Sequence, residues 1–171
     1  MHSKVTLTPK LYFAYSQFMV YDQSVRLPGC AWTDAHSAQG FARRDSTVNF
    51  SMPLECGHAN VSASRSSYRP SEKYDRVIAV PFLVTSGTVV VEGPEETNPE
   101  RSIALPPGNY RLVAAQRVTG NQEETIDLFF EPLTKPLDRS AILLADGALH
   151  PPLTWLETAG IAGEDEGHRD R

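Results

Sequence analysis

The residues of this chain that are best suited to chemistry lie in one short stretch, AWTDAHSAQGFARR, at residues 31–44. It holds the indole of Trp32, the carboxylate of Asp34 and the imidazole of His36. A carboxylate and an imidazole can form a general acid–base pair or bind a metal ion. Asp34 and His36 are separated by a single residue, and on a helix that spacing points their side chains away from each other. The stretch therefore carries reactive groups without a spacing that joins them.

A hydrolytic metal site is the main catalytic alternative, and it needs two or three ligands that meet at one point. The histidines form no HxH or HExxH pattern. Only the tertiary fold could bring Asp34, His58 and His150 together, so a metal-dependent hydrolase is a minor alternative. We expect no metal ion and no other cofactor.

Motifs for nucleophilic catalysis and phosphate binding are not found either. The sequence has no GxSxG elbow, no GxxxxGK[ST] loop and no GxGxxG loop. Cys30 and Cys56 each lack a CxxC partner, which predicts two reduced thiols rather than a zinc site or a disulfide framework. These observations together predict a protein that is not an enzyme.

The composition is that of an ordinary soluble domain. The chain has 171 residues, of which 22% are charged and 40% hydrophobic, and this length suits one domain with a core of its own. No apolar run approaches the length of a membrane span, and the N-terminal residues show no signal-peptide pattern, so we expect a cytoplasmic protein. The net charge of −5 argues against direct binding of nucleic acid, which requires clustered cations.

The elements that must position these residues are mostly strands. Alternating apolar and β-branched residues predict strands at residues 11–21, 47–52, 59–64, 102–105, 110–118 and 125–133, and two more within residues 76–92. Ser86-Gly87 is expected to join the two strands within residues 76–92 as a tight hairpin, and Gly120-Asn121 is expected to form the turn of the last hairpin, between the strands at residues 110–118 and 125–133. A β-bulge near Ser16 would keep Tyr15 on the same inward face as Phe13 and Phe18. The spacing of the turns predicts a mainly β fold, an antiparallel β-sandwich-like domain.

One short helix is expected near residues 33–40. Thr33 and Asp34 are good N-cap residues, and Gly40 is a natural C-terminal stop. Trp32 and Phe41 are expected to anchor the two ends of this helix in the core. The interpretation of the opening stretch is therefore structural first, with a contact role for the Trp32 ring as a second possibility.

The C-terminal part of the chain has a mixed pattern. Residues 134–159 contain apolar groups interrupted by glycine and proline, which predicts irregular coil with a short helical piece near residues 153–158. Residues 160–171 are polar and charged, and we expect a disordered tail. The predicted domain therefore covers residues 1–159.

Two groups of carboxylates stand out in the second half of the chain. Four lie in the predicted loop at residues 92–100: Glu92, Glu95, Glu96 and Glu100. Four others belong to the last predicted hairpin: Glu123, Glu124, Asp127 and Glu131. Such groups can serve solubility and protect exposed strand edges, or they can form a surface that meets a cationic site on another protein.

Four blocks of sequence resemble the competence protein J family, in order and in spacing. They are YSQFMVYD (15–22), AWTDAHSAQGFARRDSTVNF (31–50), YDRVIAVPFLVTSGTVVVE (74–92) and IALPPGNYRLV (103–113), and the resemblance covers roughly residues 11–130. Members of this family include the inhibitor of the DNA-entry nuclease of naturally transformable bacteria. Residues 134–171 extend beyond the resemblance.

The resemblance implies a non-catalytic protein that binds and neutralises a DNA-degrading nuclease, either a competence nuclease or a nuclease toxin. The expected partner has a basic active-site groove, where carboxylates of the inhibitor could replace phosphates. A β-sandwich that binds a carbohydrate or another small molecule is the alternative. The candidate partner-binding residues are Glu92, Glu95, Glu96, Glu100, Glu123, Glu124, Asp127, Trp32 and Asp34.

Overall fold

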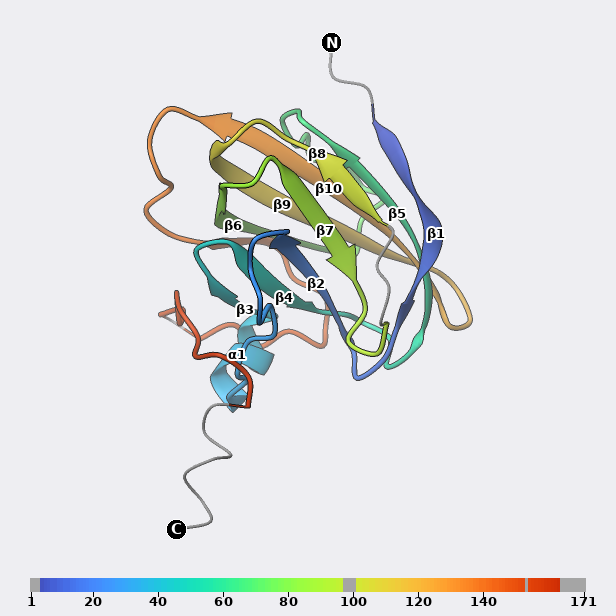
Figure 1. The fold of residues 1–171 in the computed structure, drawn as a ribbon. Coiled ribbons are helices and arrows are strands. Elements are labelled where there is room, and N and C mark those ends of the chain that lie inside the picture. The colour runs from blue at the N-terminus through green and yellow to red at the C-terminus, as the bar shows by residue number, and fades with distance from the viewer. Residues whose placement is uncertain (1–3, 97–100, 153, 164–171) are drawn as a thin grey trace.

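Two β-sheets packed face to face form the body of the protein, as a computed structural model shows for residues 4–96, 101–152 and 154–163 (Figure 1). The six-stranded sheet has the order β1 (Val5–Phe13), β5 (Gly57–Ser64), β10 (Glu123–Leu133), β9 (Gly108–Gly120), β6 (Arg76–Val84) and β11 (Ala141–Leu144). The five-stranded sheet has the order β3 (Phe41–Arg44), β4 (Thr47–Ser51), β2 (Gln17–Asp22), β7 (Thr88–Glu92) and β8 (Ser102–Ala104).

This arrangement confirms the predicted mainly β, sandwich-like fold. Every described pairing is antiparallel except that of β5 with β10, which is parallel, so the six-stranded sheet is mixed. The only helix within the described ranges is α1 (Asp34–Gln39). No helix in the described part of the chain is both long and apolar enough to span a membrane.

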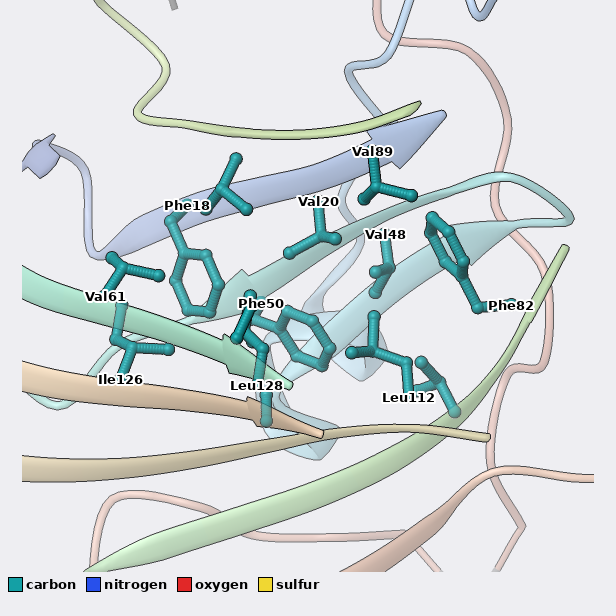
Figure 2. Close-up of a cluster of buried hydrophobic side chains, with 14 of the residues drawn as sticks. Phe18, Val20, Val48, Phe50, Val61, Phe82, Val89, Leu112, Ile126 and Leu128 are labelled. Atoms are coloured by element: carbon teal, nitrogen blue, oxygen red, sulfur yellow. The ribbon is translucent and has the colours of Figure 1, made fainter. Parts of the chain in front are cut away.

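The core lies between the two sheets and is built from the alternating residues of facing strands. Figure 2 shows side chains of both sheets pointing toward one another, among them Phe18, Phe50 and Leu112. The rings of Phe18 and Phe50 stack with their centroids 5.3 Å apart. Each such side chain contributes about 1.5–3 kcal/mol when it leaves water, so this layer is the main source of stability.

The predicted bulge near Ser16 is wrong, because the chain changes sheets there. Strand β1 ends at Phe13 in the six-stranded sheet and β2 begins at Gln17 in the five-stranded sheet. Tyr15 and Ser16 occupy the left-handed region between them, with φ of 57° and 53°. Tyr15 is consequently 68% exposed rather than inward-facing.

The predicted hairpin at Ser86-Gly87 is also wrong, for the same reason. Strand β6 belongs to the six-stranded sheet and β7 to the five-stranded sheet, so the turn carries the chain across the sandwich. The buried carboxylate of Asp22 holds this crossing by accepting hydrogen bonds from the backbone N–H groups of Thr85 (2.8 Å) and Ser86 (3.0 Å). The turn between β9 and β10 does close a hairpin, as predicted.

Helix α1 and its caps agree with the sequence. Thr33 is the N-cap, and Gly40 ends the helix with a φ of 89°. His36 completes a capping box, because its Nδ1 accepts the backbone N–H of Thr33 at 3.1 Å. Its Nε2–H is then left to donate to the carbonyl oxygen of Thr158, 3.1 Å away. Phe41 is fully buried as expected, whereas Trp32 is half-buried.

The C-terminal segment differs from its prediction. Residues 141–144 form the edge strand β11, and the described residues 154–158 are not helical. From there the chain runs past α1 as a strap, residues 154–163 (Figure 1). The side-chain amide of Gln39 holds the strap by two hydrogen bonds: its Oε1 accepts the N–H of Leu156 at 2.8 Å, and its Nε2 donates to the carbonyl oxygen of Leu156 at 2.9 Å. The strap stays hydrogen-bonded through Ala162, and residues 164–171 of the expected tail lie outside the described residues.

Candidate partner-binding surface

The candidate carboxylates lie in different environments. The side chains of Glu92, Glu124 and Asp127 are buried. Glu96 is half-buried and ion-paired with the buried Arg101, and Glu100 lies outside the described residues. Glu95 is exposed, and Glu123 is half-buried. Direct contact with a partner through a carboxylate is therefore open to only part of the predicted set.

Asp127 is neutralised within the protein. It lies on the outer face of the six-stranded sheet, where it forms ion pairs with Lys4 (3.0 Å) and Lys73 (3.7 Å). It also accepts a hydrogen bond from the hydroxyl of Tyr74 at 2.6 Å. Burial and this contact with the carboxylate raise the pKa of Tyr74. The sequence could not predict this burial, because it shows the charge of Asp127 on β10 but not that the loop carrying Lys73 and Tyr74 covers it.

Glu124 faces the interior at one end of the sandwich. It is fully buried, and its Oε2 accepts the backbone N–H of Leu54 at 3.0 Å. Oε1 has no hydrogen-bond partner among the described residues. Burial raises the pKa of Glu124 to about 7, although the Leu54 N–H and the charge of Arg76 act in the opposite direction. This carboxyl group belongs to the packing of the interior.

The loops that follow β4 and β7 and the turn before β10 lie at the end of the sandwich where the chain turns from β1 into β2 (Figure 1), and they carry or adjoin Glu55, Glu95 and Glu123. There Ser16 donates its N–H to the carbonyl oxygen of Glu55 at 2.8 Å. Gly93 lies so close to the Tyr12 carbonyl that a Cβ on Gly93 would be 1.9 Å from that oxygen. The Tyr12 and His58 rings are 5.5 Å apart. We call the surface formed by Tyr12, Tyr15, Glu55, Glu95 and Glu123 the aromatic–acidic end.

Tyr15 is the most exposed large hydrophobic residue in the described part of the chain. A hydrogen bond to the Glu95 carboxylate, together with the negative charge of Glu95, raises the pKa of the Tyr15 hydroxyl. Tyrosine is enriched among the residues that contribute most to protein interfaces, and the carboxylates beside Tyr15 would complement a cationic partner. Sequence reasoning missed Tyr15 because it continued the alternation of β1 through the turn. The break in that alternation at Ser16 was the available signal.

A groove of about 590 Å³ lies on the outer face of the five-stranded sheet. Its walls are the segment at residues 28–32, Pro94 and the end of the strap at residues 161–163, and its floor includes Gln17, Met19 and Asn49. Trp32 donates its indole N–H to Gln17 Oε1 at 3.1 Å. Asn49 donates to the same oxygen at 3.4 Å. The predicted candidate Trp32 thus lines a groove, while Asp34 is exposed in the first turn of α1.

The residues proposed for a metal site do not converge. Asp34 begins α1, His58 lies in β5 beside Tyr12, and His150 follows β11 and donates its backbone N–H to Ala38. Among the described residues, no three His, Cys, Asp or Glu side chains form a group that could hold a metal ion. Cys30 and Cys56 are both free thiols.

Comparisons with known proteins agree with this architecture. The sequence model of the family described as Competence protein J (ComJ) matches residues 10–132. The crystal structure of ComJ from Bacillus subtilis, described as an inhibitor of the DNA-degrading activity of NucA, superimposes with a TM-score of 0.67 at 22% identity. That match covers 78% of this chain and 99% of the solved one.

A second solved structure, described as crocagin biosynthetic gene J, matches with a TM-score of 0.51 at 15% identity. It covers 74% of this chain and 97% of its own. The comparison with curated protein sequences gives no significant match.

Proposed function

Because the chain belongs to the competence protein J family, we propose that it is a non-catalytic inhibitor that binds a DNA-degrading nuclease and blocks its activity. The observation that carries this proposal is the family match over residues 10–132. The match begins within β1 and ends one residue before the end of β10, and it includes all the described strands between these two. Strand β11 lies outside it. The resemblance to ComJ over nearly the whole length of that inhibitor supports it. The inhibitor acts in the cytoplasm, on a competence nuclease or on a nuclease toxin.

The aromatic–acidic end is the proposed contact surface. A nuclease that binds DNA needs a basic groove to neutralise phosphates. The Glu55 and Glu95 carboxylates can enter such a groove in place of phosphates, and the Tyr15 ring supplies apolar area at the centre of the contact. Complementary charge also speeds association, and this gain is reduced by salt.

The first test is inhibition of a purified nuclease. DNA degradation is measured while the protein is titrated against Bacillus subtilis NucA and, separately, against a nuclease purified from the native cells. Complete inhibition at a fixed stoichiometric ratio, with affinity that falls as salt rises, is the expected result. Undiminished DNA degradation with both nucleases at a large excess of the protein would overturn the proposal.

The contact surface is tested with two variants and one matched control. We expect Tyr15→Ala and Glu95→Lys each to weaken inhibition by about tenfold or more, because they remove the aromatic contact or reverse the charge. Glu72→Lys makes the same charge change in the exposed loop at residues 65–75 and should inhibit like the parent protein. Equal inhibition by all three variants would place the contact elsewhere on the molecule.

A further inference from the structure

The groove on the outer face of the five-stranded sheet has a chemical character that the aromatic–acidic end does not explain. We propose that it receives a lysine or arginine side chain of the partner nuclease, whose N–H groups donate to Asn49 Oδ1 and whose charge lies near Glu92. This inference rests on the proposed function for the identity of the partner. The chemistry of the groove itself can be tested without any nuclease.

An unsatisfied acceptor at the floor of the groove indicates that the occupant is a hydrogen-bond donor. Asn49 is only 3% exposed, and its Oδ1 has no hydrogen-bond partner among the described residues. Its amide nitrogen is already committed to Gln17 Oε1. A buried polar atom without a partner costs about 1–3 kcal/mol, so a ligand that donates to Oδ1, once the Asn49 side chain rotates toward the groove, recovers this energy on binding.

The charge around the groove favours a cation over a neutral donor. Met19 lies between Asn49 and Glu92, because it pairs with Asn49 of β4 on one side and with Glu92 of β7 on the other. The side chains of all three therefore project from the same outer face. None of the described residues that line the groove is Lys or Arg. A buried carboxylate thus flanks a floor that has no cation of its own.

Nearby arginines are already engaged. Arg101 is ion-paired with Glu96 and also donates to the carbonyl oxygens of Val91 and Pro9. Arg44 lies against the far side of the groove wall, where it donates to the carbonyl oxygens of residues 27 and 29. The pKa of Glu92 is raised, chiefly by burial and also by the negative charge of Glu96. A hydrogen bond from Tyr21 and the charge of Arg101 act in the opposite direction. A partner cation near Glu92 would favour its ionised form.

The Trp32 wall fits the same occupant. Its indole N–H is donated to Gln17, so only the carbon surface of the ring is left for contact with a ligand. An aromatic ring attracts a cation and packs well against the methylene stem of lysine or arginine. A long cationic side chain can therefore pack against the Trp32 ring, donate to Asn49 Oδ1 and place its charge near Glu92 at the same time.

The end of the strap forms one wall of the groove, so part of the groove is made by a segment that lies outside the family match. Ile161 bridges to Cys30, and Ala162 donates its N–H to the carbonyl oxygen of Gly29 at 3.1 Å. These strap residues lie beyond the family match, which ends at residue 132. The groove is therefore built partly from sequence outside the common family region, and we expect it to contribute to the choice of partner rather than to inhibition in general.

The groove is tested first with small probes. Nα-acetyl-arginine amide, Nα-acetyl-lysine amide and the neutral Nα-acetyl-norleucine amide are titrated while NMR follows the indole N–H of Trp32 and the side-chain amide of Asn49. The two cationic probes should shift both signals, and the neutral probe should not. The indole N–H of Trp155, in the strap, is the internal control. Equal shifts with the neutral probe, or no shift with either cation, would overturn the inference.

Two variants separate the acceptor from the charge. Asn49→Leu should abolish the response to both cationic probes, and Asn60→Leu on the six-stranded sheet is its matched control. Glu92→Gln keeps the shape of the side chain and removes its charge, with Glu72→Gln as control. It should weaken binding of the cationic probes even if Asn49→Leu does not fold. A response to the probes that is unchanged in Glu92→Gln would contradict the cationic assignment.

The nuclease assay distinguishes the two proposals. Against a nuclease that the parent protein inhibits, Asn49→Leu or Glu92→Gln should weaken inhibition by about tenfold, and Asn60→Leu should not. Unchanged inhibition by both groove variants would remove the groove from the interface and leave the inhibitor function standing. If the parent protein inhibits no nuclease while the cationic probes still bind, the proposed function fails and the cation site stands.

Discussion

Replacing Glu124 by glutamine should stabilise the protein, and by an amount that grows with pH. Burial raises the pKa of this carboxyl group from 4.5 to about 7. In the unfolded chain the group returns to its ordinary pKa, so between these values the folded state holds a proton that the unfolded state has lost. Stability of the parent protein therefore decreases as pH rises through this window.

The size of the effect follows from the width of the window. A shift of about 2.5 pH units corresponds to roughly 3 kcal/mol at about pH 8, where Glu124 is ionised in both states. At about pH 5 the folded protein keeps Glu124 neutral, and the cost is below about 1 kcal/mol. Glutamine is neutral throughout, and its amide oxygen can still accept the Leu54 N–H.

The geometry around Glu124 adds a second reason to expect this gain. Gln116 lies on the neighbouring strand β9, opposite Ile126, which places it on the same inner face as Glu124. Its Oε1 is buried and also has no hydrogen-bond partner among the described residues. The N–H₂ group of a glutamine at position 124 can serve as a donor for such an orphaned oxygen.

The assay is urea unfolding of the parent protein and Glu124→Gln, between about pH 5 and pH 8.5. Glu123→Gln, one residue earlier, is the control and should follow the parent curve. The difference between Glu124→Gln and the parent should be close to zero at the acidic end and largest at the alkaline end. A variant that is less stable at every pH, or a difference that does not change with pH, would refute the assignment of a buried, proton-holding carboxyl group.

Three further substitutions test the contacts that hold the sandwich and the strap. Asp22→Asn should cost about 2–3 kcal/mol at neutral pH, since the hydrogen bonds that outweigh burial and lower the pKa of Asp22 would lose their charged acceptor. Urea unfolding should show this deficit shrinking in strong acid, where the parent carboxylate is protonated; a constant deficit would contradict it. Gln39→Ala should cost about 2–3 kcal/mol in thermal unfolding and speed hydrogen exchange at Leu156, whose backbone groups lose both partners; unchanged exchange there would show that the strap is held by other contacts. Gly93→Ala should cost about 2 kcal/mol or more, because its Cβ would collide with the Tyr12 carbonyl oxygen, and a thermal midpoint equal to that of the parent would contradict this close approach.

The sequence by itself determined the features that depend on near neighbours. The alternation of Val48 and Phe50 identified the inward face of β4, and the Gly120-Asn121 signal identified the β9–β10 hairpin. Thr33 and Gly40 marked the limits of α1, because capping depends on the backbone within one turn of the helix. Family membership was equally accessible, since it depends on the order and spacing of several blocks.

Sheet assignment was decided only by the tertiary structure. A turn signal such as Ser86-Gly87 shows that the chain changes direction, but the same signal suits a hairpin and a crossing between sheets. The crossing is stabilised by Asp22, which is distant in sequence. The exposure of Tyr15 has the same origin, because the turn that presents it is another point where the chain changes sheets.

The candidate site, too, was predictable only in part: its residue types were visible in the sequence, whereas their burial and their neighbours were not. Composition revealed the carboxylates, but their burial depends on what covers each of them: the segment around Leu54 for Glu124, and the loop that carries Tyr74 for Asp127. The groove beside Trp32 could not be predicted, because one of its walls comes from residues 161–163 at the far end of the chain. Residue types are a property of the sequence, whereas burial and proximity are set by contacts between segments that are remote in sequence.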